Sequence, residues 1–369
     1  MKILWCFNGV VNSGYWVASK NYILAMEKAG LDVVLRIVNG QTTELTELKH
    51  LTDKSESGCD VLIIHGLPIS FQFDGRFKKC IGLFAWETDR ICSSWVKSCN
   101  QMDEIWVINQ QQRQACVDSG VIRPIRVVPH TEDINKFLQK YKSENPIIKK
   151  IKSNNNFKFY SIGEFIKRKN YGALLKAWHL EFDPTESVEL IIKTSKEGIN
   201  NEDCLNEFLR LNHDIKVGLK LYGNNLSIYK DPLVITERFN DNDLNAFHQV
   251  CNCFVQPSYG EAWSLPSYSS LGFLKTPIVT ACTGYLDYIS SSNGYLVECR
   301  AEPVFGVLDT FPDIYSGREN WWSVDIDDLR KKMRLAYQRK INMNNEAFVT
   351  LSKFSYEVVG SLIKKYLEA

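Results

Sequence analysis

The chain contains 369 residues, 44% of them hydrophobic, and its 44 basic side chains nearly balance 43 acidic ones to leave a formal net charge of +1. A chain of this length can form two domains that each have their own hydrophobic core. The near-zero charge gives no sign of the basic surface with which proteins bind nucleic acid, so we expect no nucleic-acid partner.

The cysteines and the N-terminus bear on the compartment. Eleven cysteines are scattered from Cys6 to Cys299, which is typical of reduced thiols in a cytoplasmic protein rather than of a small disulfide-rich domain. Asn8 and Gly9 interrupt the first apolar run, which therefore indicates a strand and not a targeting segment. No stretch approaches the roughly 20 apolar residues of a transmembrane segment. Contact with a membrane surface stays open.

The first 145 residues alternate between strand and helix patterns. Residues 2–7 form a short apolar strand, a glycine-containing loop follows at residues 8–15, and residues 17–29 have a helical pattern that ends at Gly30. Further strands are expected at residues 31–38, 60–64, 81–85, 104–108 and 125–128. Strands that alternate with helices form parallel sheets, so we expect residues 1–145 to form one Rossmann-like domain of the α/β class.

A polar and basic stretch at residues 137–156 contains Pro146 and three consecutive asparagines, and we place the connection between two domains there. The alternation then resumes, with strands expected at residues 157–162, 188–192, 233–236, 253–256 and 277–280 and helices at residues 171–179 and 243–251. We therefore expect a second Rossmann-like domain at residues 146–350. Residues 351–369 complete the chain with an amphipathic helix.

The segment at residues 254–288 is the most informative part of the sequence. Its apolar start ends at a Pro-Ser-Tyr-Gly turn that leaves Glu261 on a loop, and the signals of a helix start follow at Leu265, Pro266 and Ser267. The N-terminus of a helix presents backbone N–H groups and the positive end of the helix dipole, which favours an anion such as a diphosphate. An acid beside such a helix start suggests a nucleotide-sugar site.

A cluster of cations occupies the loop after the strand at residues 157–162, where open α/β sheets bind ligands. Arg168 can hold two phosphate oxygens and Lys169 can place a point charge beside a third. Taken alone, this Lys-Arg-Lys run is also typical of a solvated surface turn.

These two segments resemble the donor site of the family 4 glycosyltransferases, and the resemblance covers most of the chain. The matching positions of the later segment are Ser258, Gly260, Glu261, Leu265, Pro266, Gly272, Pro277, Val279, Thr280 and Gly284. The resemblance implies the GT-B fold, in which two Rossmann-like domains have parallel sheets facing a central cleft. It also implies that the C-terminal helix at residues 351–369 returns to pack on the N-terminal acceptor domain, while residues 146–350 bind the donor.

The resemblance also implies roles for individual residues. Glu261 would face the donor sugar, and Arg168 and Lys169, in the loop that begins at Gly163, would neutralise the diphosphate. Gly14, after the first strand, would allow close approach to the ligand. The remaining donor-side candidates are Leu265, Pro266, Ser267 and Ser269.

The chain departs from the family pattern at three positions, one of which is Ala262 in place of the glycine usual after the first glutamate. Ser269 stands where the family has a second glutamate that holds the nucleotide ribose, and Glu164 stands where an arginine commonly follows the glycine. A serine hydroxyl can make a hydrogen bond, but it cannot hold two ribose hydroxyls as a carboxylate can.

Three residues of the first domain are candidates for the acceptor side. Glu87 lies in a Trp-Glu-Thr stretch similar to one in some sugar transferases, and it either orients an acceptor hydroxyl or braces a neighbouring helix. His65 and His130 each follow a strand, where a histidine either points into a cleft or has a structural role.

We expect no metal site and no cofactor other than the nucleotide-diphosphate sugar that serves as donor substrate. Cys251 and Cys253 lack a second close-spaced pair and are expected to be buried structural residues, and Asp241 and Asp243 are expected to cap a helix.

The predicted function is a retaining, metal-independent, hexosyltransferase-like enzyme. It would move a sugar from the nucleotide sugar to a hydroxyl of a glycan, a lipid or a protein-linked acceptor. Two alternatives stay open: an epimerase or hydrolase of the same fold, and a degenerate protein that binds a nucleotide sugar without turnover.

Overall fold

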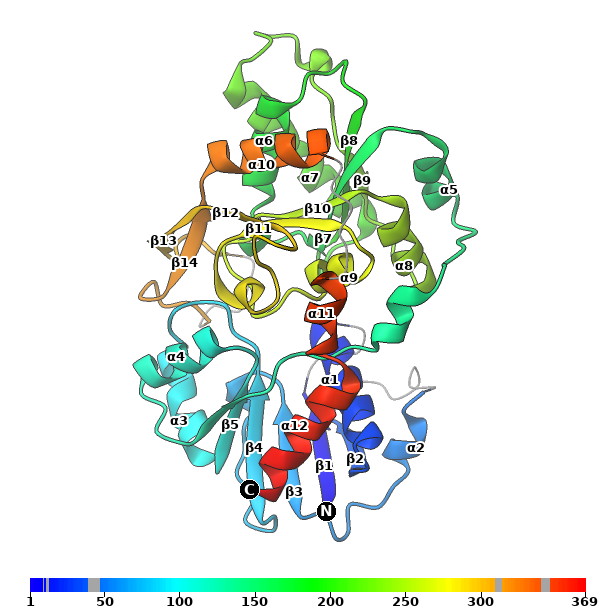
Figure 1. The fold of residues 1–369 in the computed structure, drawn as a ribbon. Coiled ribbons are helices and arrows are strands. Elements are labelled where there is room, and N and C mark those ends of the chain that lie inside the picture. The colour runs from blue at the N-terminus through cyan, green and yellow to red at the C-terminus, as the bar shows by residue number, and fades with distance from the viewer. Residues whose placement is uncertain (9, 11–12, 39–46, 309–313, 340–345) are drawn as a thin grey trace. The chain divides into compact units, whose positions relative to one another are not determined.

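The computed structural model describes residues 1–8, 10, 13–38, 47–308, 314–339 and 346–369. They form two compact units, each built around one parallel β-sheet (Figure 1). Unit 1 comprises Met1–Ile134, the described residues at 314–320 and Val349–Ala369. Unit 2 comprises the described residues of 135–308 and 321–348.

Six parallel strands form the sheet of unit 1, in the spatial order β2-β1-β3-β4-β5-β6. They are β1 (Lys2–Phe7), β2 (Asp32–Ile37), β3 (Val61–His65), β4 (Lys79–Phe84), β5 (Glu104–Val107) and β6 (Ile125–Val127). The helices of this unit are α1 (Gly14–Lys28), α2 (Lys49–Thr52), α3 (Ser93–Gln101), α4 (Gln110–Ser119) and α12 (Tyr356–Glu368). Because the strand order reverses between β1 and β3, the carboxyl ends of these two strands mark the topological switch point of unit 1.

The C-terminal helix α12 packs against α1, and Figure 1 shows the two helices side by side. Gly360 permits this contact because a Cβ atom added there would lie 2.2 Å from the Ala25 carbonyl oxygen. The Tyr356 hydroxyl donates a hydrogen bond of 2.6 Å to Asn21 Oδ1. The last helix of the chain therefore completes the unit that contains the first strand.

The sheet of unit 2 also has six parallel strands, in the order β12-β11-β10-β7-β8-β9. They are β7 (Phe157–Glu164), β8 (Val188–Ser195), β9 (Leu233–Ile235), β10 (Cys253–Gln256), β11 (Thr276–Thr280) and β12 (Tyr295–Val297). The helices are α5 (Pro146–Ser153), α6 (Tyr171–Glu181), α7 (Asn201–Leu219), α8 (Asp241–Val250), α9 (Leu265–Gly272) and α10 (Ile326–Arg339). Here the strand order reverses between β7 and β10.

Three further elements stand apart from the two six-stranded sheets. Strands β13 (Cys299–Pro303) and β14 (Asn320–Val324) form a separate two-stranded sheet. Helix α11 (Glu346–Ser352) contains the point at which the chain passes from unit 2 back to unit 1. In the described part of the chain, no helix combines the length and the apolar content needed to cross a membrane.

The predicted α/β fold with two parallel sheets is confirmed, and every predicted strand forms within a few residues of its expected bounds. The first helix begins at Gly14, earlier than expected, because the Ser13 side chain caps it by accepting a hydrogen bond from Trp16 N. Residues 9, 11 and 12 of the predicted loop before it lie outside the described residues.

The two compact units meet in the sequence shortly before the predicted domain connection. The chain passes from unit 1 to unit 2 between Ile134 and Asn135, and helix α5 occupies much of the expected linker at residues 137–156. Ile148 and Ile151 of α5 are buried in the hydrophobic core, which stabilises a helix that the polar composition concealed.

Candidate functional site

The strand reversal in unit 2 brings two loops together at one edge of the sheet. The first follows β7, and the second follows β10, which pairs with β7 in parallel. The carboxyl ends of neighbouring parallel strands lie at the same edge, and a crevice opens where the strand order reverses. The backbone N–H of Tyr259, in the second loop, donates a 2.9 Å hydrogen bond to the carbonyl oxygen of Arg168, in the first.

A carboxylate and two cations meet at this edge. Glu261 Oε2 lies 2.9 Å from Arg168 Nη1, and Glu261 Oε1 lies 2.6 Å from Lys169 Nζ. The Ser258 hydroxyl donates to the same Oε1 atom over 2.9 Å. The carboxylate side chain is 6% exposed, whereas those of Arg168 and Lys169 are 20% and 11% exposed, so the cations form the more accessible part of the cluster.

The charge of Glu261 follows from its partners. Burial acts to raise the pKa of Glu261, but the positive charges and hydrogen bonds of Arg168 and Lys169 outweigh it and lower the pKa to about 2. Glu261 is therefore ionised at neutral pH, and the three side chains together carry one net positive charge.

The loop that carries Glu261 is hydrogen-bonded to the turn after β11. Its backbone N–H donates to Thr283 Oγ1 over 3.0 Å, and its carbonyl oxygen accepts from Gly284 N over 2.9 Å. A Cβ atom added at Gly284 would lie only 1.9 Å from the Ala262 carbonyl oxygen, so no larger residue fits there without moving the loop.

Helix α9 begins directly after this loop, with Leu265 and Pro266 as its first two residues. Its N-cap is Ser264, which adopts a left-handed conformation with φ of +71°. The Ser264 hydroxyl accepts a hydrogen bond from Ser267 N and donates one of 2.6 Å to Gln256 Oε1. Ser267 and Ser269 are both buried, so the candidate donor group at this helix start is its backbone and dipole rather than a serine side chain.

Gly163, at the end of β7, is packed most closely by Gln256 and Tyr171, and the Lys169 side chain lies at contact distance. An added Cβ atom there would lie 3.4 Å from Lys169 Cδ and 3.2 Å from Gln256 Nε2. The neighbouring Glu164 accepts a hydrogen bond from the backbone of Glu197, 3.3 Å away. An ion-pair partner of Glu261 is thus Arg168, whereas Glu164 is hydrogen-bonded to the loop after β8.

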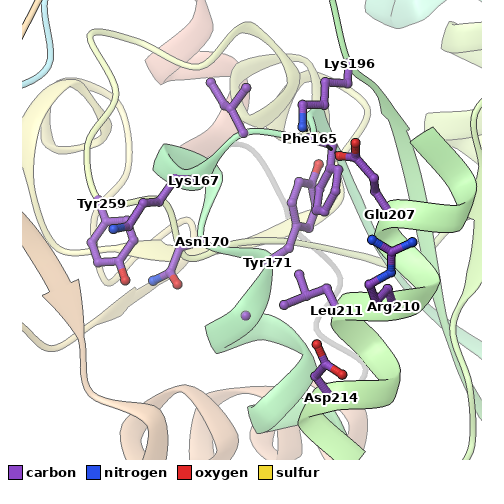
Figure 2. A pocket seen from close by; sticks show the side chains of 12 residues that line it. Phe165, Lys167, Asn170, Tyr171, Lys196, Glu207, Arg210, Leu211, Asp214 and Tyr259 are labelled. Carbon is purple, nitrogen blue, oxygen red and sulfur yellow. Dashed lines mark hydrogen bonds and ion pairs between the residues drawn. The ribbon is translucent and has the colours of Figure 1, made fainter. Parts of the chain in front are cut away.

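A pocket of about 540 Å³ lies beside the turn that carries the cations, and sequence reasoning missed it (Figure 2). Phe165 and Tyr171 lie between Lys167 on one side and the charged residues of α7 on the other. Its lining residues are Phe165, Ile166, Lys167, Asn170, Tyr171, Gly172, Lys196, Glu207, Arg210, Leu211, Asp214 and Tyr259. The amphipathic pattern of α7 was the signal that could have pointed to it.

A second pocket, of about 510 Å³, adjoins the same turn. It is lined by Lys167, Tyr259, Glu302, Pro303, Phe305 and Trp321. The rings of Tyr259 and Trp321 stack at 4.3 Å with an angle of 14° between their planes. Arg168, Lys169 and Glu261 line neither pocket, so both lie next to the charged cluster and do not contain it.

Comparisons with known proteins bear on the fold. No family model matches the chain, and no curated protein matches its sequence. Solved structures do match, among them HepE from Anabaena in complex with UDP-glucose, with a TM-score of 0.68, 14% identity and coverage of 100% of this chain and 99% of that one. The chain has the GT-B fold.

Two further solved structures agree with the GT-B assignment. Sucrose-phosphate synthase from Thermosynechococcus elongatus matches with a TM-score of 0.67 and 12% identity, over 99% of this chain and 98% of that one. A glycosyltransferase from Rickettsia africae matches with a TM-score of 0.66 and 11% identity, over 99% of this chain and 97% of that one. At these identities the likeness shows the fold, and the predicted GT-B fold is confirmed.

The first GT-B unit places its candidate residues differently. Gly14 is the first residue of α1, and a Cβ atom added to it would meet no atom of the described residues within 4 Å. No packing contact with the described part of the chain therefore requires glycine at this position.

His65 is a core residue of unit 1. Its side chain is 0% exposed, its Nδ1 lies 2.5 Å from Ser19 Oγ, and the Trp5 ring packs on it at 5.5 Å. Burial lowers the pKa of His65 well below its ordinary value and lowers the pKa of His130 to about 3. Both rings are neutral and buried, which corresponds to the structural role that the sequence left open for them.

Glu87 accepts a 2.5 Å hydrogen bond from the Tyr315 hydroxyl, and the ring of Tyr315 also packs on Trp86 at 5.4 Å. Two residues later, the Asp89 carboxylate accepts hydrogen bonds from the backbone N–H and the side-chain amide of Asn320. Glu87 is thus hydrogen-bonded to the segment at residues 314–320.

The acidic and cysteine pairs considered for metals have structural surroundings. Asn240, and not Asp241 or Asp243, is the N-cap of α8, because its side chain accepts a hydrogen bond from Asp243 N. Cys251 and Cys253 are buried in unit 2, and burial raises the pKa of both thiols.

Proposed function

We propose that the protein transfers a sugar from a nucleotide-diphosphate sugar to a hydroxyl group of an acceptor. The observation that carries this proposal is the cluster of Glu261, Arg168 and Lys169 at the strand reversal of unit 2 in a chain with the GT-B fold. The presence of UDP-glucose in the crystal structure of HepE, which shares this fold, supports the class of donor.

Arg168 and Lys169 would stabilise the leaving group. When the bond between the sugar C1 atom and the phosphate oxygen breaks, the electron pair stays with the diphosphate and its negative charge grows. Two cations that are already held in place beside that charge lower the barrier without having to reorganise. The start of α9 would add the positive end of its dipole on the same edge of the sheet.

Glu261 would position the donor rather than exchange protons with it. A carboxylate whose pKa is about 2 is a poor general base near neutral pH, because the proton-transfer driving force is small. A carboxylate offers about four lone-pair sites. Arg168, Lys169 and Ser258 engage three of these, which leaves capacity for a sugar hydroxyl.

The finer assignments belong to the same proposal. We infer that transfer proceeds with retention at the anomeric carbon, that Arg168 and Lys169 take the place of a divalent metal, and that a hexose is moved. The acceptor is a glycan, a lipid or a protein-linked hydroxyl bound on the side of unit 1, and the reaction takes place in the cytoplasm. Glu87 and Gly14 are the unit 1 residues that we propose for contact with the acceptor or donor.

The test is incubation of the purified protein with a panel of nucleotide sugars, with and without hydroxyl acceptors, while the release of free nucleotide diphosphate is measured. Release that depends on an acceptor supports transfer. Slow release without any acceptor instead indicates a hydrolase, and a changed sugar on an intact nucleotide indicates an epimerase. Binding of a nucleotide sugar without any turnover contradicts the proposal and supports the degenerate alternative, for which Ser269 in place of a second acid is the motivating observation.

A further inference from the structure

One stretch of unit 2 is strongly basic in an otherwise nearly neutral chain. Residues 136–152 contain six lysines, no arginine and a single acid, Glu144. Because the whole chain has a formal net charge of +1, the remaining residues carry more acidic than basic side chains. A local excess of this kind creates a positive field that the net charge of the protein conceals.

This stretch lies on one face of the unit 2 sheet. Tyr160 and Ile162 of β7 belong to the hydrophobic cluster that includes residues of α5 and α8. Phe159 of the same strand belongs to the cluster that includes residues of α6 and α10. Side chains alternate along a strand, so α5 and α8 cover one face of the sheet and α6 and α10 cover the other. Figure 1 shows α5 beside α8, and the two helices are in contact.

Helix α5 presents its lysines to solvent. Ile148 and Ile151 are buried in the core, whereas Lys149, Lys150 and Lys152 are exposed. Lys149 pairs with Glu144. In the described part of the chain, Lys150 and Lys152 have no acid within ion-pair distance. The outer side of α5 therefore carries positive charge that the protein itself does not neutralise.

The segment before α5 is fixed to α8 through its backbone. Gln249 Nε2 donates a 2.6 Å hydrogen bond to the Gln139 carbonyl oxygen, and Tyr141 N donates one of 2.9 Å to Gln249 Oε1. Asn242 Nδ2 donates to the Lys142 carbonyl oxygen over 2.8 Å. The side chain of Lys142 is nevertheless exposed. This segment thus displays its lysines from a fixed backbone and not from a loose linker.

Two exposed leucines accompany these lysines. The rings of Phe137 and Phe273 are buried with their centres 5.1 Å apart, and each phenylalanine is followed in the chain by a leucine. Leu138 is 66% exposed and Leu274 is 43% exposed. The phosphates of a nucleic acid offer a leucine no partner, whereas the boundary between the headgroups and acyl chains of a bilayer does.

We propose that these residues form a lysine surface that docks unit 2 on a lipid bilayer containing anionic lipids, with the two leucines inserted among the headgroups. The lysine surface consists of Leu138, Lys140, Lys142, Lys149, Lys150, Lys152 and Leu274. Each lysine close to such a bilayer strengthens binding about fivefold. Arginine, which makes the commonest specific contacts to DNA bases, is absent from residues 136–152, and this favours a bilayer over nucleic acid.

Cosedimentation of the full chain with lipid vesicles tests the proposal. We expect binding to vesicles of phosphatidylcholine mixed with phosphatidylglycerol, and little binding to vesicles of phosphatidylcholine alone. Raising the salt from about 0.1 M to about 1 M should release most of the protein, because the Debye length falls from about 10 Å to about 3 Å. Equal binding to both kinds of vesicle, or no binding to the anionic ones, overturns the proposal.

A triple variant removes charge from the lysine surface. The combination of Lys140→Ala, Lys150→Ala and Lys152→Ala should lower the partition into anionic vesicles about a hundredfold, because three fivefold contributions are lost. The thermal unfolding of this variant should match that of the wild type, since all three side chains are exposed.

A second triple variant is the matched control for net charge. The combination of Lys97→Ala, Lys176→Ala and Lys331→Ala removes three exposed lysines from α3, α6 and α10, which lie outside the lysine surface. Partition should change by less than about threefold, because these side chains do not reach the headgroups. Equal losses in the two triple variants would show that only the overall charge matters and would overturn the proposal.

A leucine variant tests the apolar part of the contact. Leu138→Ser should lower the partition about tenfold, because the side chain can no longer enter the apolar boundary of the bilayer. Leu209→Ser removes a leucine that is 42% exposed on α7, and it should leave the partition unchanged. Equal binding of Leu138→Ser and the wild type would contradict the insertion of the leucine.

Competition with a DNA duplex separates the bilayer from nucleic acid. We expect the duplex not to displace the protein from anionic vesicles. Complete displacement, with duplex binding that the lysine-surface variant also loses, would overturn the proposal in favour of a nucleic-acid partner. Vesicle binding requires no turnover, so its failure leaves the proposed function standing, and a protein that docks without releasing nucleotide diphosphate contradicts the proposed function alone.

Discussion

The two parallel sheets present different chemistry at their points of strand reversal. In unit 2, the loops after β7 and β10 direct an acid and two cations to one edge, where they pair over 2.6 to 2.9 Å. In unit 1, the last residue of β3 is His65, which turns inward and lies neutral among aromatic rings. The same position in two similar sheets therefore holds a charged cluster in one unit and a core residue in the other.

The difference shows what topology decides and what it leaves to the local sequence. Topology fixes the edge of the sheet at which ligands bind. Whether a side chain there faces the ligand or the core depends on its neighbours. Arg168 and Lys169 lie on a turn beyond the end of strand β7, outside the sheet. His65, in contrast, is still part of strand β3.

The largest effect is expected at Glu261. Glu261→Gln should lower turnover about a thousandfold, because the donor loses its anchor, and should also destabilise the protein by about 2 kcal/mol, because two cations lose their partner. Nucleotide-diphosphate release and urea denaturation measure the two effects. Glu207→Gln, which removes a carboxylate from the ion pair with Lys196 in the same unit, is the matched control and should change neither strongly.

The next largest loss of turnover is expected when a cation of the cluster is removed. Arg168→Ala should lower turnover about a hundredfold, because one of two groups that stabilise the diphosphate is lost. The neighbouring Lys167 is exposed and its Nζ contacts the Phe305 carbonyl oxygen instead of Glu261. Lys167→Ala should therefore leave turnover nearly unchanged, and equal losses in both variants would break the distinction between the cluster and its neighbour.

Alanine substitutions at two glycines, one in each unit, should change the free energy of unfolding by different amounts. Gly284→Ala should destabilise the protein by about 3 kcal/mol, because the new methyl group collides with the Ala262 carbonyl and displaces the Glu261 loop. Gly14→Ala, at the start of α1, should be neutral or stabilising by up to about 1 kcal/mol. Thermal unfolding measures the stability of both variants. A large loss of stability in Gly14→Ala would contradict the open space around Gly14.

The buried histidines of unit 1 should appear in the pH dependence of stability. The pKa of His130 is about 3 in the folded protein against 6.5 for an unperturbed histidine, so in between the unfolded chain binds a proton that the folded chain does not. Stability must then fall as the pH drops from about 6.5 toward 3, by up to about 1.4 kcal/mol per pH unit for each such histidine.

Denaturation at a series of pH values checks this directly. His130→Asn should flatten the slope between pH 4 and 6, and the exposed His50→Asn should not. Glu261 contributes separately: its pKa is lowered from 4.5 to about 2, so its stabilisation is present above pH 4.5 and is lost only as the pH falls toward 2.

The smallest expected effect is that of divalent metals, which should not change turnover. If Arg168 and Lys169 carry the charge of the diphosphate, then EDTA should leave turnover unchanged, and added Mg²⁺ or Mn²⁺ should not raise it. A loss with EDTA that either metal restores would overturn the metal-independent mechanism.

The sequence predicted the strands and the charged cluster for physical reasons. Apolar runs bounded by Gly, Pro and Asn mark strands of a sheet that is buried on both faces, and residues that follow such strands gather at one edge. The association of Glu261 with Arg168 and Lys169 needed the strand order as well, which came from the resemblance and not from periodicity.

Other features depend on contacts that no local pattern records. The hydrogen bond between Glu87 and Tyr315 joins residues 228 positions apart, and it forms only after the segment at 314–320 joins unit 1. Helix α5 was concealed because it is short, its three lysines match its three isoleucines in number, and only two of those isoleucines bury deeply. The His65 side chain points into the core because its ring finds space and a hydrogen-bond partner at Ser19 of α1. The residues of β3 alone give no sign of that contact.

The contact of α12 with α1 has a consequence for how the protein can be made. During synthesis, the ribosome has released all of β1 to β6 long before Tyr356 exists to bind Asn21. Until then α1 lacks the neighbour that covers it, so the nascent N-terminal half stays incomplete until α12 has been synthesised. Pieces cut after residue 134 should consequently aggregate unless the final helix is supplied in trans.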